Sequence, residues 1–229
     1  MKSKSTSNLA LLIACAMFGA VGFVIIKFTG IPILPNANFL KFDFSDVIVT
    51  IGMFLFGIWP GIFIAIIRML LSLIYSGFNL ASIVGQLAAL IASVCYALPF
   101  YFVTRHVKRD ETSGMKRHVK PIIGLICGTI AMAVVLATLN ALILTPMYAV
   151  TTVPNLPAIH GYSGLLGFTE KVYLGQLLHI PSMGTYIFGI IVPFNLLKGL
   201  INSIVVYLLF EAVLRNLKPF VQKNFNLKR

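Results

Sequence analysis

Charged residues are scarce in this chain of 229 residues. Aspartate, glutamate, lysine and arginine together make up 10% of it, whereas hydrophobic residues make up 59% and the mean hydropathy is +0.95. Soluble domains are about 25% charged and roughly 45–50% apolar. The composition therefore excludes a soluble protein and predicts an integral membrane protein, and the length predicts one membrane domain over residues 1–229.

Groups that support common chemistries are also missing. The three cysteines, Cys15, Cys95 and Cys127, are dispersed within apolar stretches and form neither a disulfide framework nor a metal site. The sequence has no glycine-rich phosphate-binding loop of the Walker A type, so we expect no ATP hydrolysis by that route. We accordingly predict a protein without a metal, a cofactor or a catalytic activity of its own.

Acidic residues are the rarer charge, with 6 against 18 lysines and arginines, so the formal net charge is +12. Such a charge can indicate nucleic-acid binding, but here the basic residues cluster beside apolar runs, which is typical of membrane topology. We predict an all-α bundle of six spans, at about 9–29, 43–58, 60–76, 80–104, 121–145 and 184–214. With the N-terminus inside, thirteen lysines and arginines fall on the cytoplasmic side and three outside, so both termini are expected in the cytoplasm.

Several residues predict where the spans break. The second and third spans are near the lower limit of about 17 residues for a membrane helix, and Trp59-Pro60-Gly61 predicts the break between them. Pro193 predicts a kink in the sixth span that frees backbone groups. The outer segments 30–42 and 146–183 are expected to be loops, which often cover or line a binding site.

A short polar stripe interrupts the sixth span. Asn195 and Lys198 are three residues apart and share one helix face, and Asn202 extends it by a turn. Buried asparagines often join membrane helices for about 1 kcal/mol, which explains Asn202 or Asn140 individually. An ionisable residue within a span is a functional-site hypothesis by default. We therefore interpret Asn140, Asn195 and Lys198 as ligand contacts.

The segment Phe39-Leu-Lys-Phe-Asp43-Phe-Ser-Asp46 leads from the first outer loop into the second span. Asp43 or Ser45 can cap the helix that starts here, because acidic groups favour the positive end of the helix dipole. Asp46 lies in the first turn, where it can pair with a basic side chain or with the ligand. The segment is thus a candidate for both helix capping and ligand binding.

Arg68 lies in the middle of an otherwise apolar span. An unpaired guanidinium there is costly, so we expect a structural ion pair. Glu211 is the predicted partner, because both residues lie nearer the cytoplasmic side.

The first span carries small residues at four-residue spacing in two registers, Ala10/Ala14 and Ala16/Ala20. Small residues let another helix approach closely. Packing within the protein and docking of a partner subunit explain this face equally well.

Residues 161–164, Gly-Tyr-Ser-Gly, match the sequence around the serine of rhomboid intramembrane proteases. A nucleophilic Ser163 needs a base within reach, and that family places a histidine in its last span. The last span here has none, since His160 and His179 lie in the outer segment and His106 and His118 in the cytoplasmic one. A protease is therefore the less favoured alternative.

Four elements occur in an order that resembles a known family: Phe39 to Asp46, Val84-Gly85-Gln86-Leu-Ala, Asn140 followed by Thr145-Pro-Met-Tyr148, and Pro193-Phe-Asn195-Leu-Leu-Lys198-Gly199. Together they resemble the riboflavin-specific substrate-binding (S) component of energy-coupling factor (ECF) transporters. The resemblance covers nearly the whole chain. The family has an acidic residue and an asparagine where this chain has Gln86 and Ala89, and glutamine keeps the hydrogen-bonding capacity.

This resemblance implies a subunit that binds riboflavin from outside as a transported ligand. It also implies association with a transmembrane coupling subunit and two cytoplasmic ATPases, with the alanine-rich face docking on the coupling subunit. An S component for another vitamin, such as pantothenate or a flavin analogue, is the alternative. The substrate-binding residues implied are Asn140, Asn195 and Lys198, with Phe39, Leu40, Lys41, Asp46 and Gln86 as further candidates.

Overall fold

A computed structural model describes residues 4–32, 41–105, 116–153 and 156–225, and the described chain is almost entirely helical. The one sheet among these residues pairs β1 (Ile31–Pro32) antiparallel with β2 (Lys41–Phe42). The first half of the bundle consists of α1 (Lys4–Thr29), α2 (Ser45–Phe56), α3 (Ile58–Ser76) and α4 (Leu80–Thr104). The second half consists of α5 (Lys116–Leu139), η1 (Asn140–Leu144), α6 (Thr145–Thr152), α7 (Gly161–Phe168), η2 (Thr169–Leu177), α8 (Met183–Tyr186), η3 (Ile187–Ile191), α9 (Val192–Leu209), η4 (Phe210–Leu214) and α10 (Arg215–Asn224), in which η denotes π-helical turns.

By length and composition, five helices within the described ranges are suited to cross a membrane. They cover Asn8–Thr29, Ile58–Ser76, Leu80–Thr104, His118–Thr152 and Met183–Asn224, the last two running through π-helical turns. The apolar helix α2 has 12 residues, about 18 Å, which is shorter than the roughly 30 Å hydrocarbon core of a bilayer. The all-α membrane class is confirmed, and the predicted second span is a half-length helix.

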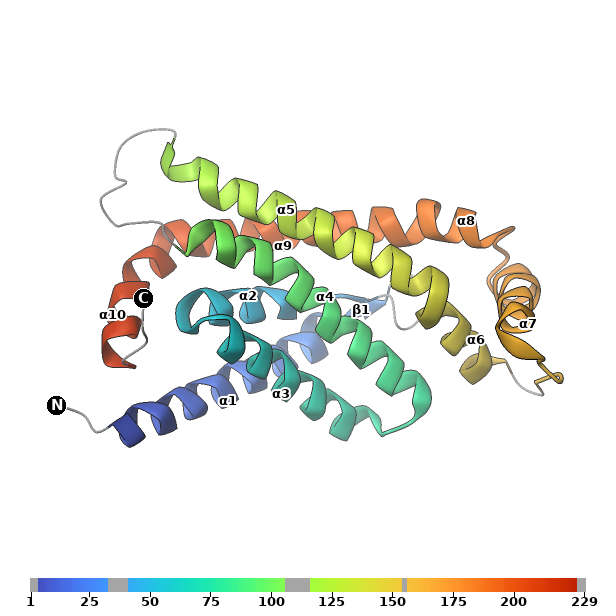
Figure 1. The fold of residues 1–229 in the computed structure, drawn as a ribbon, viewed down its shortest axis with the longest axis horizontal. Helices are drawn as coiled ribbons and strands as arrows, with labels where there is room; N and C mark the ends of the chain where they lie inside the picture. Colours follow the sequence, from blue (N-terminus) through green and yellow to red (C-terminus); the bar gives the residue numbers. More distant parts are fainter. Residues whose placement is uncertain (1–3, 33–40, 106–115, 154–155, 226–229) are drawn as a thin grey trace.

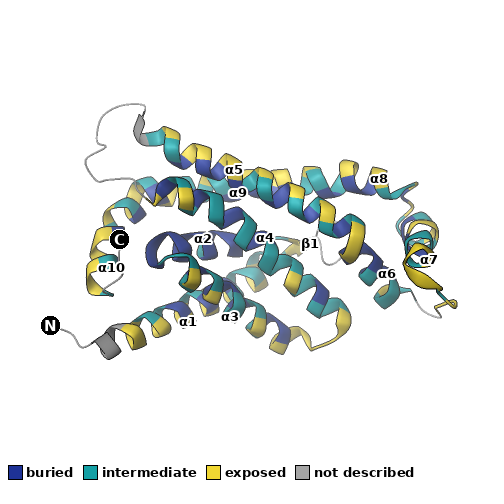
Figure 2. Cartoon of the chain, viewed as in Figure 1, coloured by how far each residue is buried: buried dark blue, intermediate teal, exposed yellow. Residues whose placement is uncertain are grey.

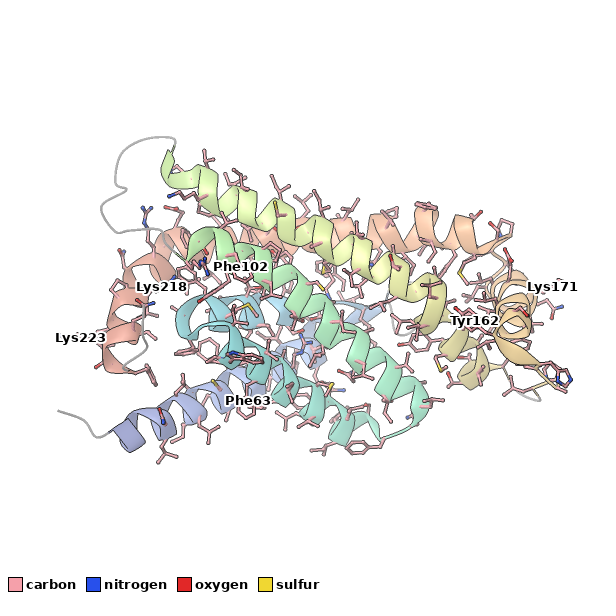
Figure 3. All side chains as sticks on the ribbon, in the orientation of Figure 1. Phe63, Phe102, Tyr162, Lys171, Lys218 and Lys223 are labelled. Atoms are coloured by element: carbon pink, nitrogen blue, oxygen red, sulfur yellow. The ribbon has the colours of Figure 1, made fainter. Side chains whose placement is uncertain are left out.

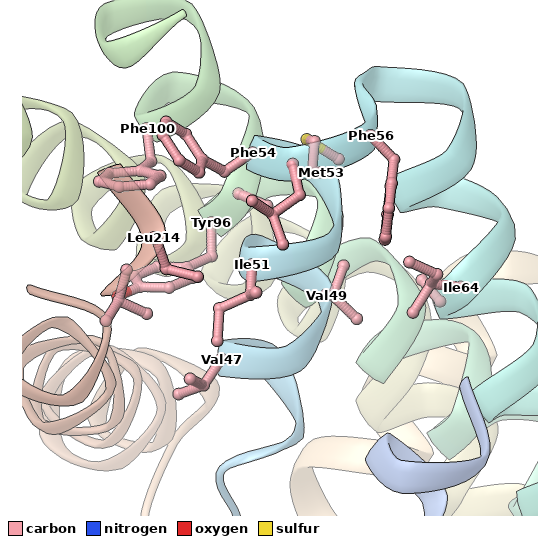
Figure 4. Close-up of a cluster of buried hydrophobic side chains, with 14 of the residues drawn as sticks. Val47, Val49, Ile51, Met53, Phe54, Phe56, Ile64, Tyr96, Phe100 and Leu214 are labelled. Atoms are coloured by element: carbon pink, nitrogen blue, oxygen red, sulfur yellow. The ribbon is translucent and has the colours of Figure 1, made fainter. Parts of the chain in front are cut away.

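The short helix α2 lies at the centre of the bundle, and nearly all of its residues are buried (Figure 2). The ring of Phe54 packs between Phe100 of α4 and Phe210 of η4, at centroid distances of 5.9 and 5.2 Å. Figure 4 shows Phe54 and Phe100 within this cluster of buried side chains. The amphipathic α10 turns across the end of α2, where Lys218 Nζ lies 4.1 Å from the centroid of Phe54. Helix α10 thereby covers the end of a helix that is shorter than the hydrocarbon core of a bilayer.

The break between α2 and α3 lies two residues earlier than the predicted Trp59-Pro60-Gly61. It is at Gly57, whose φ of 105° favours glycine, and α3 begins at Ile58. Pro60 falls in the first turn of α3, where a missing amide hydrogen leaves no hydrogen bond unmade.

The prediction that 146–183 forms a loop is wrong for most of that segment. The helix that begins at α5 continues through η1 and α6 to Thr152, and α7 and η2 follow after a short connection. Pro146 has no amide hydrogen for the carbonyl of Leu142, four residues earlier, and Tyr162 Oη donates to that carbonyl at 2.5 Å. The helix therefore tolerates its proline because a side chain from α7 satisfies the free carbonyl.

The described part of the chain begins and ends at the same end of the bundle. Figure 1 shows the start of α1 and helix α10 at one end of the bundle, and α7 at the other. Figure 3 shows Lys218 and Lys223 at the first end and Lys171 at the second.

Candidate functional site: a buried cluster of two carboxylates and two cations

Four charged side chains from distant parts of the chain meet inside the bundle. Asp43 precedes α2, Asp46 lies in its first turn, Arg68 is in the middle of α3 and Lys198 is in α9. All four are buried, with exposed fractions of 4, 1, 0 and 7% respectively. Two positive and two negative charges balance, which a water-excluded site requires because a lone buried charge is very costly.

Lys198 bridges the two carboxylates. Its Nζ lies 3.0 Å from Asp43 Oδ2 and 2.9 Å from Asp46 Oδ2. Asn202, one turn further along α9, donates from Nδ2 to the same Asp46 oxygen at 3.3 Å. Asp46 therefore pairs with a basic side chain, as one of its two predicted roles required, and Asn202 joins α9 to α2.

Arg68 holds the other side of the cluster. Its Nη1 donates to Ser45 Oγ and Ser93 Oγ, each at 2.8 Å, and lies 3.4 Å from Asp46 Oδ1. Its Nη2 donates to the carbonyl of Ala89 at 3.0 Å. Helix α3 is thus tied to α2 and α4 through one guanidinium.

The predicted pair between Arg68 and Glu211 is wrong. Glu211 Oε1 lies 3.6 Å from His118 Nδ1 and 3.9 Å from Arg215 Nη1, among the residues at the α10 end of the bundle. Both aspartates are nearer to Arg68 along the chain than Glu211 is, and the first turn of α2 places Asp46 beside Arg68.

Asp43 stabilises the start of α2. Its Oδ1 accepts the backbone N–H of Ser45 at 2.8 Å and also a short hydrogen bond from Ser45 Oγ. The other oxygen of Asp43, Oδ2, pairs with Lys198 Nζ. One carboxylate thus joins the start of α2 to α9.

Asn140 and Asn195 are buried on neighbouring helices, beside π-helical turns that contact each other. Asn140 opens η1 and donates from Nδ2 to its own helix at the Leu136 carbonyl, at 2.8 Å. Asn195 follows η3 and donates in the same way to the Ile191 carbonyl, at 2.8 Å. Each primary amide has two N–H groups and one carbonyl oxygen, so both side chains keep hydrogen-bonding capacity for a further group. π-Helical turns occur frequently at functional sites.

The break in the α-helical pattern before Pro193 lies where the sequence predicts it. Residues 187–191 form η3, and the proline follows in the first turn of α9. Pro193 has no amide hydrogen to donate to the carbonyl of Gly189.

The remaining candidate ligand contacts lie in different surroundings. Gln86 is half-buried on α4, and its Oε1 makes no hydrogen bond with any residue that the structure describes. Lys41 is exposed on β2. Phe39 and Leu40 lie outside the described residues.

The structure separates the two alanine registers of α1. Ala10, Ala16 and Ala20 are exposed, whereas Ala14 is half-buried and packs against the core. The side that faces the bundle is formed by Cys15 and by neighbouring glycines. Internal packing therefore does not account for Ala16 and Ala20.

Ser163 is exposed on α7. The neighbouring residues of its short motif have structural roles, because Gly161 adopts a φ of 69° where α7 begins and Tyr162 binds the free carbonyl of Leu142. Within the described ranges, no group of three histidine, cysteine or acidic side chains could hold a metal ion.

Two apolar cavities are separate from the charge cluster. An apolar groove of about 710 Å³ lies between α5 and the helix that runs from α8 to α9, and one of about 470 Å³ lies between α1 and α3. Neither is lined by Asn140, Asn195 or Lys198.

The sequence reasoning missed Ser93, the contact of Ser45 with Arg68, and the bridge from Asp43 to Lys198. The scarcity of acid carries a usable signal for the bridge, because Asp43, Asp46 and Glu211 are the only acidic residues next to apolar spans. A lysine buried in a span is therefore expected to form an ion pair with one of these three. No comparable signal singles out Ser93 among the serines of the spans.

Comparisons with known proteins agree on one family. A family model described as the ECF transporter, substrate-specific component, matches residues 10–210. The chain is 32% identical over 210 residues to the riboflavin transporter RibU of Staphylococcus aureus (strain TCH60), covering 90% of this chain and 92% of that protein. It is 27% identical over 221 residues to the riboflavin transporter FmnP of Bacillus subtilis (strain 168), covering 93 and 94%. A solved structure described as the S component of a bacterial ECF transporter superposes with a TM-score of 0.63 at 29% identity, covering 92% of this chain and 99% of that one.

Proposed function

The chain belongs to the family of ECF transporter substrate-specific components, and we propose on this premise that it binds riboflavin for an ATP-driven importer of a bacterial membrane. The observation that carries this function is the match over nearly the whole chain to proteins named riboflavin transporters. The protein is a transport subunit, and riboflavin is its substrate rather than a cofactor.

The chemistry of the buried cluster suits this substrate. Riboflavin is uncharged at neutral pH, and a cluster of two cations and two carboxylates presents no net charge to it. An anionic vitamin such as pantothenate would instead place a further carboxylate beside Asp43 and Asp46, at a cost in free energy. The charge balance therefore favours riboflavin over the anionic alternative.

We propose that Asn140, Asn195 and Lys198 contact the flavin. The isoalloxazine ring has a uracil-like edge on which a donor lies between two acceptors, and asparagine amides can match both kinds of group. Lys198 supplies only donors, and two of its three N–H groups serve Asp43 and Asp46. The third suits a ring carbonyl or a ribityl hydroxyl. Gln86, Asp46, Lys41 of β2 and the two residues before it, Phe39 and Leu40, are proposed as further contacts.

We propose a topology of six spans with both termini in the cytoplasm. The topology is supported by thirteen lysines and arginines on the cytoplasmic side against three on the outer side. The position of Lys171 at the α7 end, away from α10, also supports it (Figure 3). In this topology α2 is the shortest of the spans and α10 lies at the cytoplasmic surface.

The ECF module is the proposed partner, as a transmembrane coupling subunit and two cytoplasmic ATPases. The absence of a Walker A sequence in this chain agrees with energy supplied by other subunits. The exposed small residues Ala10, Ala16 and Ala20 offer a face of α1 on which another membrane helix can pack closely, with Ala14 at its edge.

Absorption and titration of the purified full chain test this function. We expect a flavin absorption band that is lost with the ligand on denaturation, and quenching of riboflavin fluorescence on titration. Leucine substitution of Asn140 or Asn195 should weaken binding about tenfold, since each hydrogen bond contributes about 1 kcal/mol or more, whereas Asn216→Leu on the exposed face of α10 should not. A colourless protein that leaves riboflavin fluorescence unchanged would contradict the assignment.

A further inference from the structure

The position of the Lys198 ammonium is set by the two carboxylates that it bridges. The distances from Nζ to Asp43 Oδ2 and Asp46 Oδ2 differ by only 0.1 Å, so neither aspartate dominates. A long lysine side chain has considerable rotamer freedom of its own. The direction of its remaining N–H therefore depends on how each carboxylate is oriented.

Each carboxylate is in turn oriented through its other oxygen. The terminal torsion of an aspartate is broad, so hydrogen bonds rather than rotamer preference fix the carboxylate plane. Asp43 Oδ1 accepts hydrogen bonds from Ser45, and Asp46 Oδ1 accepts a short one from Ser93. Both carboxylates thus have one oxygen held by a serine and one directed at Lys198.

One side chain connects the two serines. Arg68 Nη1 donates to Ser45 Oγ and to Ser93 Oγ at the same distance of 2.8 Å, and Nη2 is anchored on the Ala89 carbonyl of α4. A serine hydroxyl that accepts from Arg68 is left to donate its own hydrogen, from Ser45 to Asp43 and from Ser93 to Asp46, with the Ala89 carbonyl 2.9 Å from Ser93 Oγ as a second acceptor. Arg68 therefore imposes the donor direction on both hydroxyls.

We propose that Arg68, acting through Ser45 and Ser93, is a positioning residue that orients the Lys198 ammonium toward riboflavin. The inference rests on the proposed function, in which Lys198 donates to the flavin. Arg68 is fully buried, and its guanidinium donates to Ser45, Ser93 and the Ala89 carbonyl. The planar fork of a guanidinium suits this task, because a lysine at position 68 keeps the charge but cannot reach two hydroxyls and a carbonyl at once.

Charge-conserving variants test the proposal by riboflavin titration of the purified full chain. Ser93→Ala removes one link of the network without changing the net charge, and Arg68→Lys removes the fork. Each is expected to weaken riboflavin binding about tenfold, because the Lys198 donor is no longer held in place. Ser72→Ala is the matched control: Ser72 is buried one turn away on α3, and its hydroxyl makes no hydrogen bond with any described residue.

A second background separates positioning from a general loss of structure. In the charge-balanced double variant Lys198→Met/Asp43→Asn, Ser93→Ala should leave the remaining riboflavin affinity unchanged, since the group that it acts through is gone. A purely structural role would weaken binding by the same factor in both backgrounds. Ser45→Ala, which acts through Asp43, repeats the comparison should Ser93→Ala fail to fold.

The outcomes are distinguishable. Loss of affinity only where Lys198 is present supports the inference. Equal losses in both backgrounds, or no loss in either, overturn it while leaving riboflavin binding intact. A native chain that binds no riboflavin overturns the proposed function and this inference together.

Discussion

Removing the Lys198 ammonium should affect folding and binding by different amounts, and the structure allows the two effects to be separated. Lys198→Met leaves Asp43 and Asp46 buried with only Arg68 to balance them. Removing one partner of a buried ion pair costs about 3–5 kcal/mol of unfolding free energy. Adding Asp43→Asn restores the balance of one cation and one carboxylate. The double variant should therefore recover most of that stability.

Riboflavin affinity should not recover with the stability. The hydrogen bond from a charged donor contributes about 1.5–3 kcal/mol, so its loss should weaken binding about ten- to hundredfold in both variants. Thermal unfolding in detergent without riboflavin measures the first effect, and fluorescence titration measures the second. Lys171→Met, which alters an exposed lysine on η2, is the control for removing a positive charge.

Two results would refute this reasoning. If Lys198→Met unfolded at the same temperature as the native chain and the Lys171→Met control, the buried bridge would not stabilise the fold. If the double variant regained full affinity along with its stability, Lys198 would act only by balancing charge.

Two further substitutions probe the scaffold, each by thermal unfolding in detergent. Tyr162→Phe should cost about 0.5–1.5 kcal/mol, because the Leu142 carbonyl loses its hydroxyl donor; unchanged stability would contradict this account of α7 docking. Gly128→Ala should cost about 1–3 kcal/mol, since its Cβ would lie 2.3 Å from the Tyr96 carbonyl oxygen, and a neutral result would show that α4 and α5 separate freely.

The sequence predicted the residues of the cluster better than their partners. Burial of Lys198 in a span and the position of Asp46 in a first turn follow from hydropathy and helix capping, and both are confirmed. Which helices face each other does not follow from helical periodicity, and the choice of Glu211 for Arg68 was wrong for that reason. Ser93 lies on a fourth helix, so the link from Arg68 to Asp46 depends entirely on tertiary packing.

The prediction that residues 146–183 form a loop failed for a different physical reason. Proline and glycine normally indicate loops, but a membrane helix tolerates proline when another group satisfies the free carbonyl. Tyr162 is 20 residues from Leu142 and belongs to another helix, so no local pattern reveals the compensation. By contrast, the predicted span 80–104 coincides with α4, where Asn79 caps the first turn.

The order in which the cluster's charges enter the membrane follows from their separation along the chain. Arg68 follows Asp46 by 22 residues, whereas Lys198 follows Asp43 by 155. At ribosomal rates of roughly 5–20 residues per second, Lys198 is synthesised roughly 8 to 30 s after Asp43. A chain that stops before α9 holds two buried carboxylates with only Arg68 to balance them, so the charge balance of the bundle is complete only once α9 has joined it.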